Sequence, residues 1–198
     1  MEMISQMHTF DGVPAAAELR GTTVVVVDLE ATCWKDGDIN ASEIIEIGAV
    51  RVTPAGSLAD RFQTFVQPKE HPVLSEFCTQ LTHIRQADVD AAPAYPEALE
   101  AFANWADQLP PYILASWGEY DKNQLRRDCR RHAVTYPFGR HVNLKKVYAQ
   151  HVGKPPCGMA RALAQAGLPL LGTHHRGIDD AVNIARILRW MWAMEDTP

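Results

Sequence analysis

The apolar positions in the first third of the chain predict three strands that follow one another closely. A β-branched apolar run over residues 23–28 has the composition of a strand buried on both faces. Residues 43–52 have the composition of a second strand, and residues 59–66 follow the turn residues 54–57 as a third. Because the connections are short, we expect an antiparallel meander.

The rest of the chain changes to helical spacing. Residues 96–109 repeat apolar side chains at the spacing of a helix, and residues 112–117 have the composition of a further strand. Four more helices are predicted, at residues 121–133, 144–151, 159–166 (closed by Gly167) and 177–194. Strands first, and then alternating helix and strand, predict an α/β fold with a mixed sheet flanked by helices.

Length and composition favour one compact domain. The chain has 198 residues, of which 46% are hydrophobic and 22% are charged, values typical of a globular protein rather than a disordered one. Residues 1–20 show no sustained periodicity, and no linker divides the remainder. We therefore expect an N-terminal lead-in over residues 1–20 and a single domain over residues 21–195.

Charge, cysteines and apolar runs limit the class of protein. A net charge of −5 is unsuited to coating nucleic acid through overall charge, although it leaves room for a local basic patch. Apolar runs fall short of the roughly 18 to 20 residues that span a bilayer, and the N-terminus lacks an export signal pattern. The four cysteines form no C-x-x-C pair, so reduced thiols and a cytoplasmic location are expected, with no membrane partner.

Two acidic residues, Asp28 and Glu30, come at the end of the first apolar strand. Alternation along a strand directs both side chains to the same face. Two desolvated carboxylates repel each other unless a cation joins them, and oxygen ligands suit Mg²⁺ or Mn²⁺. The alternative is that the strand has ended and both acids are solvated. Asp121 also follows an apolar strand and opens a helix, where a carboxylate can equally serve as a cap.

A third acidic signal lies at the start of the last helix. Asp180 shares its helical stripe with Ile184 and Ile187 and is expected to face inward, whereas the stripe of Asp179 with Asn183 and Arg186 is expected to be solvated. A loop histidine five residues before Asp180, His175, can reach the same pocket. Its neighbour His174 is expected to point in a different direction.

Together these residues resemble the DnaQ-like, or DEDDh, family of 3′→5′ exonucleases, whose five motif positions match Asp28, Glu30, Asp121, His175 and Asp180. Within the family, the likeness is to the enhanced-RNAi-type histone-mRNA 3′ exonuclease branch. It covers about residues 22–192, and it is carried by residues 28–33, 43–46, 75–82 and 177–186. Because some animal relatives place the second-motif acid directly after the tryptophan, Glu119 is a minor rival to Asp121.

The resemblance implies a ribonuclease H-like fold, in which a mixed five-stranded sheet has an antiparallel meander followed by parallel strands. It also implies hydrolysis from the 3′ end of single-stranded nucleic acid, RNA by this branch, with release of 5′ nucleoside monophosphates. The implied cofactors are two Mg²⁺ or Mn²⁺ ions held by the four carboxylates, with His175 as the base. Protein partners are not predicted.

Substrate contacts are implied for several residues around this site. The resemblance places Leu29, Ala31 and Thr32 in the terminal-nucleotide pocket, while Trp117 either stacks near it or packs in the core. Packing is favoured over base contact for Phe77, Leu81 and Ile84. A basic cluster predicts either phosphate binding or a solvated helix face; its members are Lys122, Arg126, Arg127, Arg130 and Arg131, then Arg140, His141, Lys145 and Lys146.

Two other functions remain open. A DNA-directed exonuclease of repair or proofreading would share all the catalytic residues, because recognition of the 2′-hydroxyl depends on details of the pocket. An inactive nucleic-acid-binding module is opposed by the intact set of carboxylates and histidine.

Overall fold

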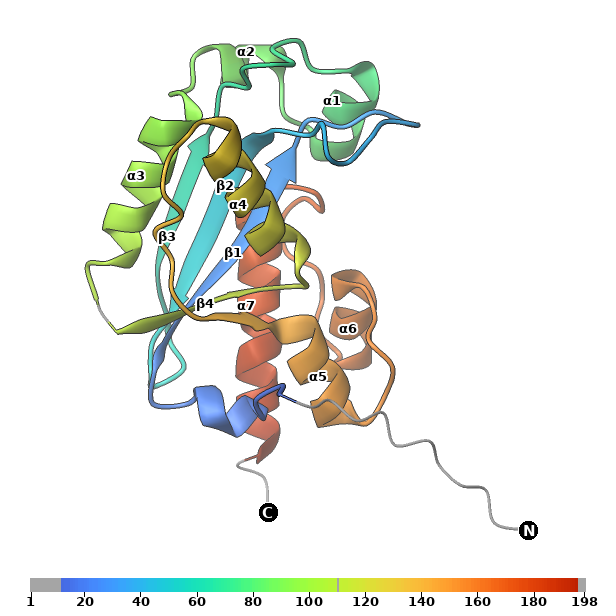
Figure 1. Ribbon diagram of the computed structural model, residues 1–198. Helices are drawn as coiled ribbons and strands as arrows, with labels where there is room; N and C mark the ends of the chain where they lie inside the picture. Colours follow the sequence, from blue (N-terminus) through green and yellow to red (C-terminus); the bar gives the residue numbers. More distant parts are fainter. Residues whose placement is uncertain (1–11, 110, 196–198) are drawn as a thin grey trace.

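The computed structural model describes residues 12–109 and 111–195, and its centre is one five-stranded sheet in the order β3-β2-β1-β4-β5 (Figure 1). The strands are β1 (Thr23–Ala31), β2 (Ile44–Val52), β3 (Leu58–Phe65), β4 (Tyr112–Ser116) and β5 (His141–Asn143). The first three form an antiparallel meander, while β4 pairs parallel to β1 and β5 parallel to β4. The predicted mixed sheet is confirmed.

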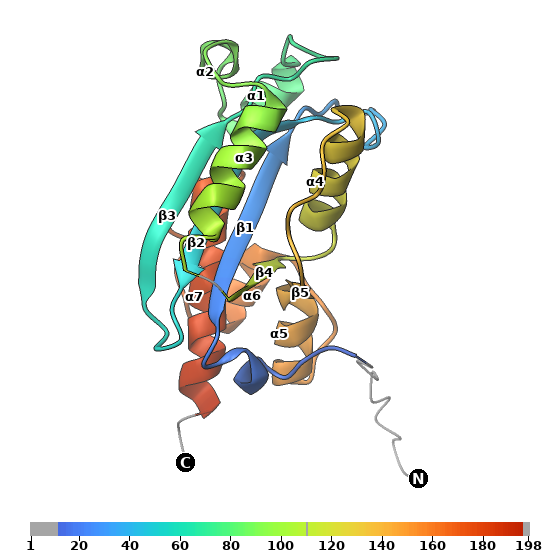
Figure 2. The ribbon, with the colours of Figure 1, turned by 60° about the vertical axis from the view of Figure 1, so that its left-hand side comes forward.

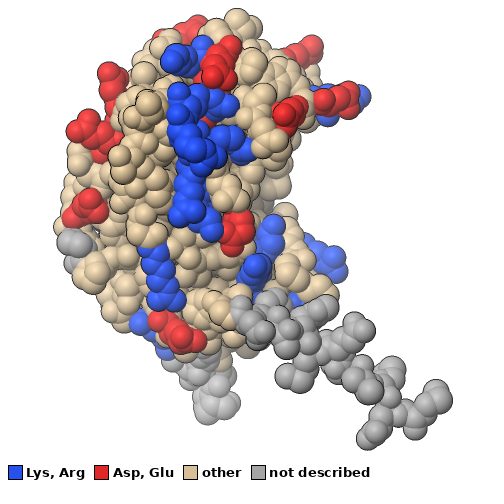
Figure 3. Space-filling view, viewed as in Figure 1, with Lys and Arg blue, Asp and Glu red and all other residues tan. Residues whose placement is uncertain are grey.

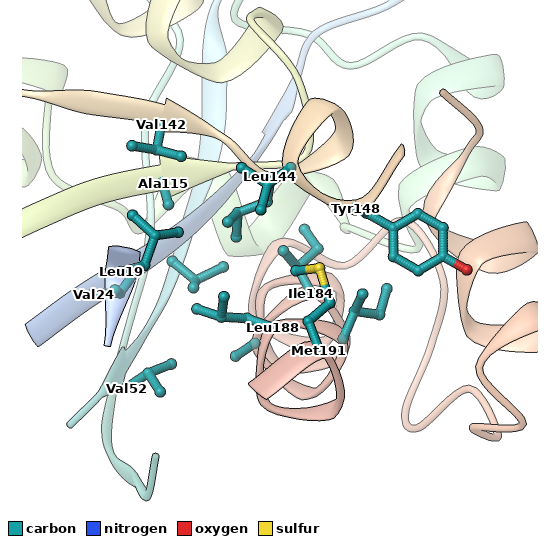
Figure 4. Close-up of a cluster of buried hydrophobic side chains, with 14 of the residues drawn as sticks. Leu19, Val24, Val52, Ala115, Val142, Leu144, Tyr148, Ile184, Leu188 and Met191 are labelled. Carbon is teal, nitrogen blue, oxygen red and sulfur yellow. The ribbon is translucent and has the colours of Figure 1, made fainter. Parts of the chain in front are cut away.

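The long C-terminal helix α7 (Gly177–Glu195) covers one face of the sheet. On this face Val24 of β1 belongs to the same apolar cluster as Ile184 and Leu188 of α7 (Figure 4). Val26 of β1 belongs to this cluster as well. Helices α5 (Leu144–Val152) and α6 (Met159–Gln165) extend this cluster. As expected from its sequence, α6 is followed by Gly167 in the left-handed conformation, with φ of 68°.

The opposite face packs on α3 (Tyr95–Ala106) and α4 (Tyr120–Arg131), which Figures 1 and 2 show on the side away from α7. Val25 and Val27 alternate with the residues of the first face and lie in this second cluster. All four valines are completely buried. The β-branched run of β1 therefore packs in the apolar clusters on both faces of the sheet, as its composition predicted.

Two short helices were not predicted, and the fifth strand that the resemblance implied was not located in the sequence. Helices α1 (Glu76–Thr82) and α2 (Gln86–Asp90) follow the meander and lie over one end of the sheet (Figure 1). The three-residue strand β5 completes the parallel part (Figure 2). The packing prediction holds for Ile84, which is fully buried between α1 and α2, but it is wrong for Phe77, which is 40% exposed.

Part of the predicted lead-in packs against the domain. Residues Ala16–Leu19 form a short 3₁₀ helix, η1, whose Leu19 is fully buried. The indole Nε1 of Trp192 on α7 donates to the carbonyl of Ala16 at 2.9 Å. The remainder of the lead-in, residues 1–11, lies outside the described residues. Within the described ranges, every helix is too short or too polar to cross a membrane.

Candidate active site

The acidic pair of β1 lies within the strand rather than at its end. Pairing with β2 continues to Ala31, with a register shift after Glu30. Asp28 is opposite Gly48, and Glu30 is opposite Glu46. The two acids are two residues apart in this paired strand, so both carboxyl groups face the same side of the sheet.

Gly48 brings the start of α7 directly onto this part of the sheet. A Cβ atom at residue 48 would lie 2.1 Å from the backbone nitrogen of Ile178, so only glycine permits this approach. As a result, Asp180 of α7 reaches the acidic pair. One carboxylate oxygen from each of Asp28, Glu30 and Asp180 lies within 4.8 Å of the other two.

The two aspartates of α7 have different surroundings. Asp180 is 5% exposed and faces inward, as predicted. The prediction that Asp179, Asn183 and Arg186 form a solvated stripe is wrong for Asn183, which is completely buried. The Asn183 side chain accepts from the Leu171 N–H at 3.1 Å and donates to the Leu171 carbonyl at 2.8 Å, so it holds the preceding loop against the helix.

Asp121 reaches the same site from the first turn of α4. Strands β1 and β4 run parallel, so their carboxyl ends meet at one edge of the sheet. Asp121 is 5% exposed, and its Oδ1 accepts a hydrogen bond from the Leu29 N–H at 3.2 Å. Its rival Glu119 instead pairs with Lys122 and accepts from Asn143 outside the cleft. Position therefore favours Asp121.

Burial raises the pKa of all four carboxyl groups. The pKa of Asp28 lies well above its usual value because of desolvation and the charges of Asp121 and Glu30. Desolvation, with the charge of Asp180, raises the pKa of Glu30 to about 9. Desolvation also raises the pKa of Asp121 and of Asp180 to about 6 each. An uncompensated cluster of this kind disfavours the folded protein at neutral pH.

A hard divalent cation fits this donor set. The Oδ1 atom of Asp180 is buried and lacks a hydrogen-bond partner among the described residues. Carboxylate oxygens are the ligands that Mg²⁺ and Mn²⁺ favour, and a cation would offset both the repulsion and the lost hydration. Asp28, Glu30 and Asp180 could hold such an ion together.

His174 and His175 both face the acidic cluster, so the expectation that they diverge is wrong. Their ring centroids are 4.0 Å apart, and a nitrogen of each lies within 4.8 Å of an Asp180 oxygen and of the other. The cause is the left-handed backbone of His175 (φ 63°), whose N–H donates to Asp180 Oδ2 at 3.0 Å. Burial, followed by the charges of His174 and His83, lowers the pKa of His175.

These groups line an open cleft of about 350 Å³. Its walls include the four carboxylates and both histidines, together with Leu29, Ala31, Leu81, Trp117, Tyr120 and Met159. Trp117 packs on Tyr148, with 5.7 Å between the ring centroids, and it also lines the cleft. A cation held by the carboxylates would attract a phosphate in this cleft, with an imidazole beside it.

Comparison with known proteins agrees with this geometry. A profile of the exonuclease (RNase_T) family matches residues 25–188, most of the chain. The chain belongs to the exonuclease family. It is 33% identical over 192 residues to ERI1 exoribonuclease 2 of Mus musculus, across 84% of this chain and 28% of the mouse protein. It is 30% identical to 3′-5′ exonuclease Snipper of Drosophila melanogaster, across 83% of this chain and 67% of Snipper.

Among solved structures, this exonuclease-family chain superposes on the nuclease domain of 3′hExo, a DEDDh family member bound to rAMP. The TM-score is 0.82 at 29% identity, covering 88% of this chain and 92% of that domain. These similarities confirm the resemblance to the ERI-type branch and the ribonuclease H-like fold. The chain spans 27% to 35% of the length of the ERI1 exoribonuclease 2 proteins from mouse, frog, human and zebrafish.

Two residues of this exonuclease-family site have roles that sequence reasoning did not assign. Thr32 is buried, and its hydroxyl accepts from the Glu43 N–H at 2.9 Å, so it does not line the cleft where the resemblance placed it. Glu46, known from the sequence only as part of a matching segment, is fully buried. Its Oε2 accepts from Arg176 Nε and from the Gly177 N–H, each at 3.1 Å, which ties the histidine loop to the sheet.

The predicted basic cluster divides into structural and exposed residues. Arg131 is 11% exposed and pairs with Asp128 and Glu70, so it is committed to the fold. Arg126 and Arg130 are exposed on α4, where Figure 3 shows a stripe of lysines and arginines running down the molecule. Among the arginines of α4, those two are the exposed ones, whereas Arg127 and Arg131 are partly buried.

Proposed function

We propose that this chain is a divalent-metal-dependent 3′→5′ exonuclease that acts on single-stranded RNA and releases 5′ nucleoside monophosphates. The observation that carries the proposal is the meeting of Asp28, Glu30 and Asp180 within 4.8 Å, beside His175, in an open cleft. The exoribonuclease names of the relatives and the rAMP in the 3′hExo structure support RNA as the substrate and a nucleoside monophosphate as the product.

Two Mg²⁺ or Mn²⁺ ions are the proposed cofactors. Asp28, Glu30 and Asp180 would hold one, and Asp28 with Asp121 the other. Asp121 is not one of the three residues whose oxygens all lie within 4.8 Å of one another, yet its charge acts on Asp28, which supports a second ion position beside the first. When bound, such ions polarise the scissile phosphate, activate a water molecule and stabilise the leaving 3′-oxygen.

The chain's own groups position the substrate and move the proton. His175 is the proposed general base, because its lowered pKa keeps the imidazole neutral, and only the neutral ring can accept a proton from water. Leu29, Ala31 and Trp117 line the cleft and are proposed to orient the terminal nucleotide. The sheet and α7 fix the carboxylates in place before substrate arrives.

The test compares RNA and DNA single strands of one sequence, each labelled at its 5′ end, with Mg²⁺ or with excess chelator. We expect RNA to shorten stepwise from its 3′ end only when metal is present, and DNA to shorten more slowly. Asp180→Asn should yield no ladder. Faster shortening of DNA would favour the DNA-directed exonuclease, binding without cleavage would favour the inactive module, and full cleavage in chelator would contradict the metal mechanism.

A further inference from the structure

A second, smaller pocket adjoins the catalytic cleft. Its volume is about 250 Å³, and it lies between the loop after β1 and the start of α4. Its walls are formed by Cys33, Trp34, Gly37, Asp38, Ile39, Ser42 and Tyr120. Because Cys33 and Tyr120 also line the catalytic cleft, the two spaces adjoin through shared walls.

The walls of this pocket suit a flat apolar ring. Gly37 packs against the Trp34 ring, since a Cβ atom at residue 37 would lie 2.9 Å from its Cε3 atom. The edge of His71 also contacts Trp34, with ring centroids 4.7 Å apart at 77°. Ile39 is 56% exposed and Tyr120 is 37% exposed, which leaves apolar surface open to a ligand. Aromatic side chains of this kind bind single-stranded bases by stacking, without selecting one sequence.

The loop that forms the pocket is fixed to α4 before any ligand binds. Arg127 Nη1 donates to Asn40 Oδ1 at 2.8 Å, and Gln124 Nε2 donates to the Ser42 carbonyl at 2.9 Å. Arg131 Nη1 donates to the same carbonyl at 3.0 Å. These bonds hold the walls in place. Because Arg131 is already paired with Asp128 and Glu70, and the wall residue Asp38 is acidic, stacking rather than charge is the interaction that the pocket offers.

We propose that this pocket binds the nucleobase next to the 3′-terminal nucleotide of a single-stranded substrate, with Trp34 and Tyr120 as its stacking surfaces. The inference rests on the proposed exonuclease function. A strand whose terminal nucleotide occupies the cleft must leave through an open side, and the pocket shares two walls with that cleft. The base next to the terminal nucleotide is the nearest one along the strand, so it is the base expected to enter a pocket that adjoins the cleft.

A double-mutant cycle, in which the second base and the Trp34 ring are removed singly and together, tests this assignment. RNAs with an abasic nucleotide at the second, third or fourth position from the 3′ end are compared with intact RNA, using wild type and Trp34→Ala. In wild type, loss of the second base should raise KM by about 5- to 150-fold, the worth of one stacked base. Trp34→Ala should raise KM for intact RNA by a factor in the same range. In this variant, loss of the second base should change KM very little.

Two controls separate this inference from the proposed function. Trp34→Phe keeps an aromatic ring and should retain part of the base dependence. The p-nitrophenyl ester of uridine 5′-monophosphate has no second base, so Trp34→Ala should hydrolyse it as wild type does. If wild type cleaves neither the ester nor RNA, the exonuclease function itself fails. If both are cleaved but the second-base penalty persists in Trp34→Ala, or appears only at the third or fourth position, the pocket assignment is wrong.

Discussion

Asp180 is both a proposed metal ligand and a buried charge that destabilises the metal-free protein. Burial raises its pKa to about 6, so its ionised form at neutral pH disfavours the metal-free folded state. Asp180→Asn removes the charge and keeps an oxygen that can accept the His175 N–H bond. We expect the metal-free variant to melt at a higher temperature than wild type while losing about a hundredfold or more in cleavage rate.

Calorimetry with and without Mg²⁺ checks the stability part of this prediction, and a cleavage assay checks the rate. Mg²⁺ should raise the Tm of wild type and barely change that of Asp180→Asn, because the variant has lost one ligand and one repelling charge. A metal-free variant that melts below wild type would show that charge repulsion at this site is not a significant destabilising force.

The histidine pair gives a second prediction. His175→Ala should lower turnover by about 10² to 10⁴, the usual worth of a positioned base, whereas His174→Ala should retain most activity. Because burial lowers the pKa of His175 below its usual 6.5, the wild-type rate should rise with pH through that lower value and level off near neutrality. The rise should persist in His174→Ala and vanish in His175→Ala. The opposite pattern would identify His174 as the base, which the shared orientation of the two rings permits.

Glu46 gives a third prediction, because its carboxylate ties the histidine loop to β2. Glu46→Ala should lower kcat by about 10² with a smaller change in KM, since a small misplacement of a catalytic group has an effect of that size. Glu46→Gln should lose less, because its amide oxygen, in the place of Oε2, can still accept both bonds. Steady-state kinetics of the three proteins at equal metal concentration measure these differences.

Glu43 supplies a matched control for that experiment. It is also buried, and it accepts three backbone N–H bonds, from Lys69, Glu70 and His71, in a loop outside the cleft lining. Glu43→Ala should lower the Tm without the selective loss of kcat. If the two variants lose activity only in proportion to their loss of stability, Glu46 supports the fold and does not position the site.

At the scale of elements, the sequence predicts those with long or distinct patterns. The valine run of β1 and the stripe of α7 extend over enough residues to define a period, so both are confirmed. Helices α1 and α2 and strand β5 have seven, five and three residues, too few for a period to emerge. In β5 only Val142 is buried, so an apolar pattern is absent.

The site could be predicted to the extent that its residues lie at recognisable places on elements. Asp28, Asp121 and Asp180 lie late in a strand or in the first turn of a helix, and the structure brings them together as expected. The part played by Glu46 depends on the β1–β2 register and on where α7 begins, which no local pattern encodes. The orientation of His174 depends on the positive φ of His175, which is uncommon for a residue with a side chain.

Helix α4 gives a prediction at its own scale. Replacing the exposed Arg126 and Arg130 by glutamine should weaken RNA binding and reduce the slope of log K against log salt by about one for each phosphate that is no longer neutralised. Cleavage at saturating RNA should stay near wild type. Arg131→Gln is the contrasting variant, because it removes the pairs with Asp128 and Glu70 and should lower the Tm. An unchanged salt slope in the double variant would mean that this face is only solvated.

At the scale of the whole molecule, one sheet brings distant segments to a single cleft. Residues 28–30, 121 and 174–180 meet because β1 lies between the antiparallel and the parallel parts of the sheet, with α7 across its face. Each segment is anchored by buried apolar residues, so the acidic cluster is preorganised despite its repulsion.

Attack at the 3′ end can be distinguished in one experiment from attack at the 5′ end and from attack within the strand. Linear and circularised single-stranded RNAs of the same sequence are incubated with the protein and Mg²⁺, and the first products are identified by mass spectrometry. The nucleotide at the 3′ end of the RNA differs from the one at its 5′ end. The expected result is that the 5′ monophosphate of the 3′-terminal nucleotide is released first from the linear RNA, with the circle intact over the same period. Cleavage of the circle at a comparable rate, or release of longer fragments first, would contradict the account.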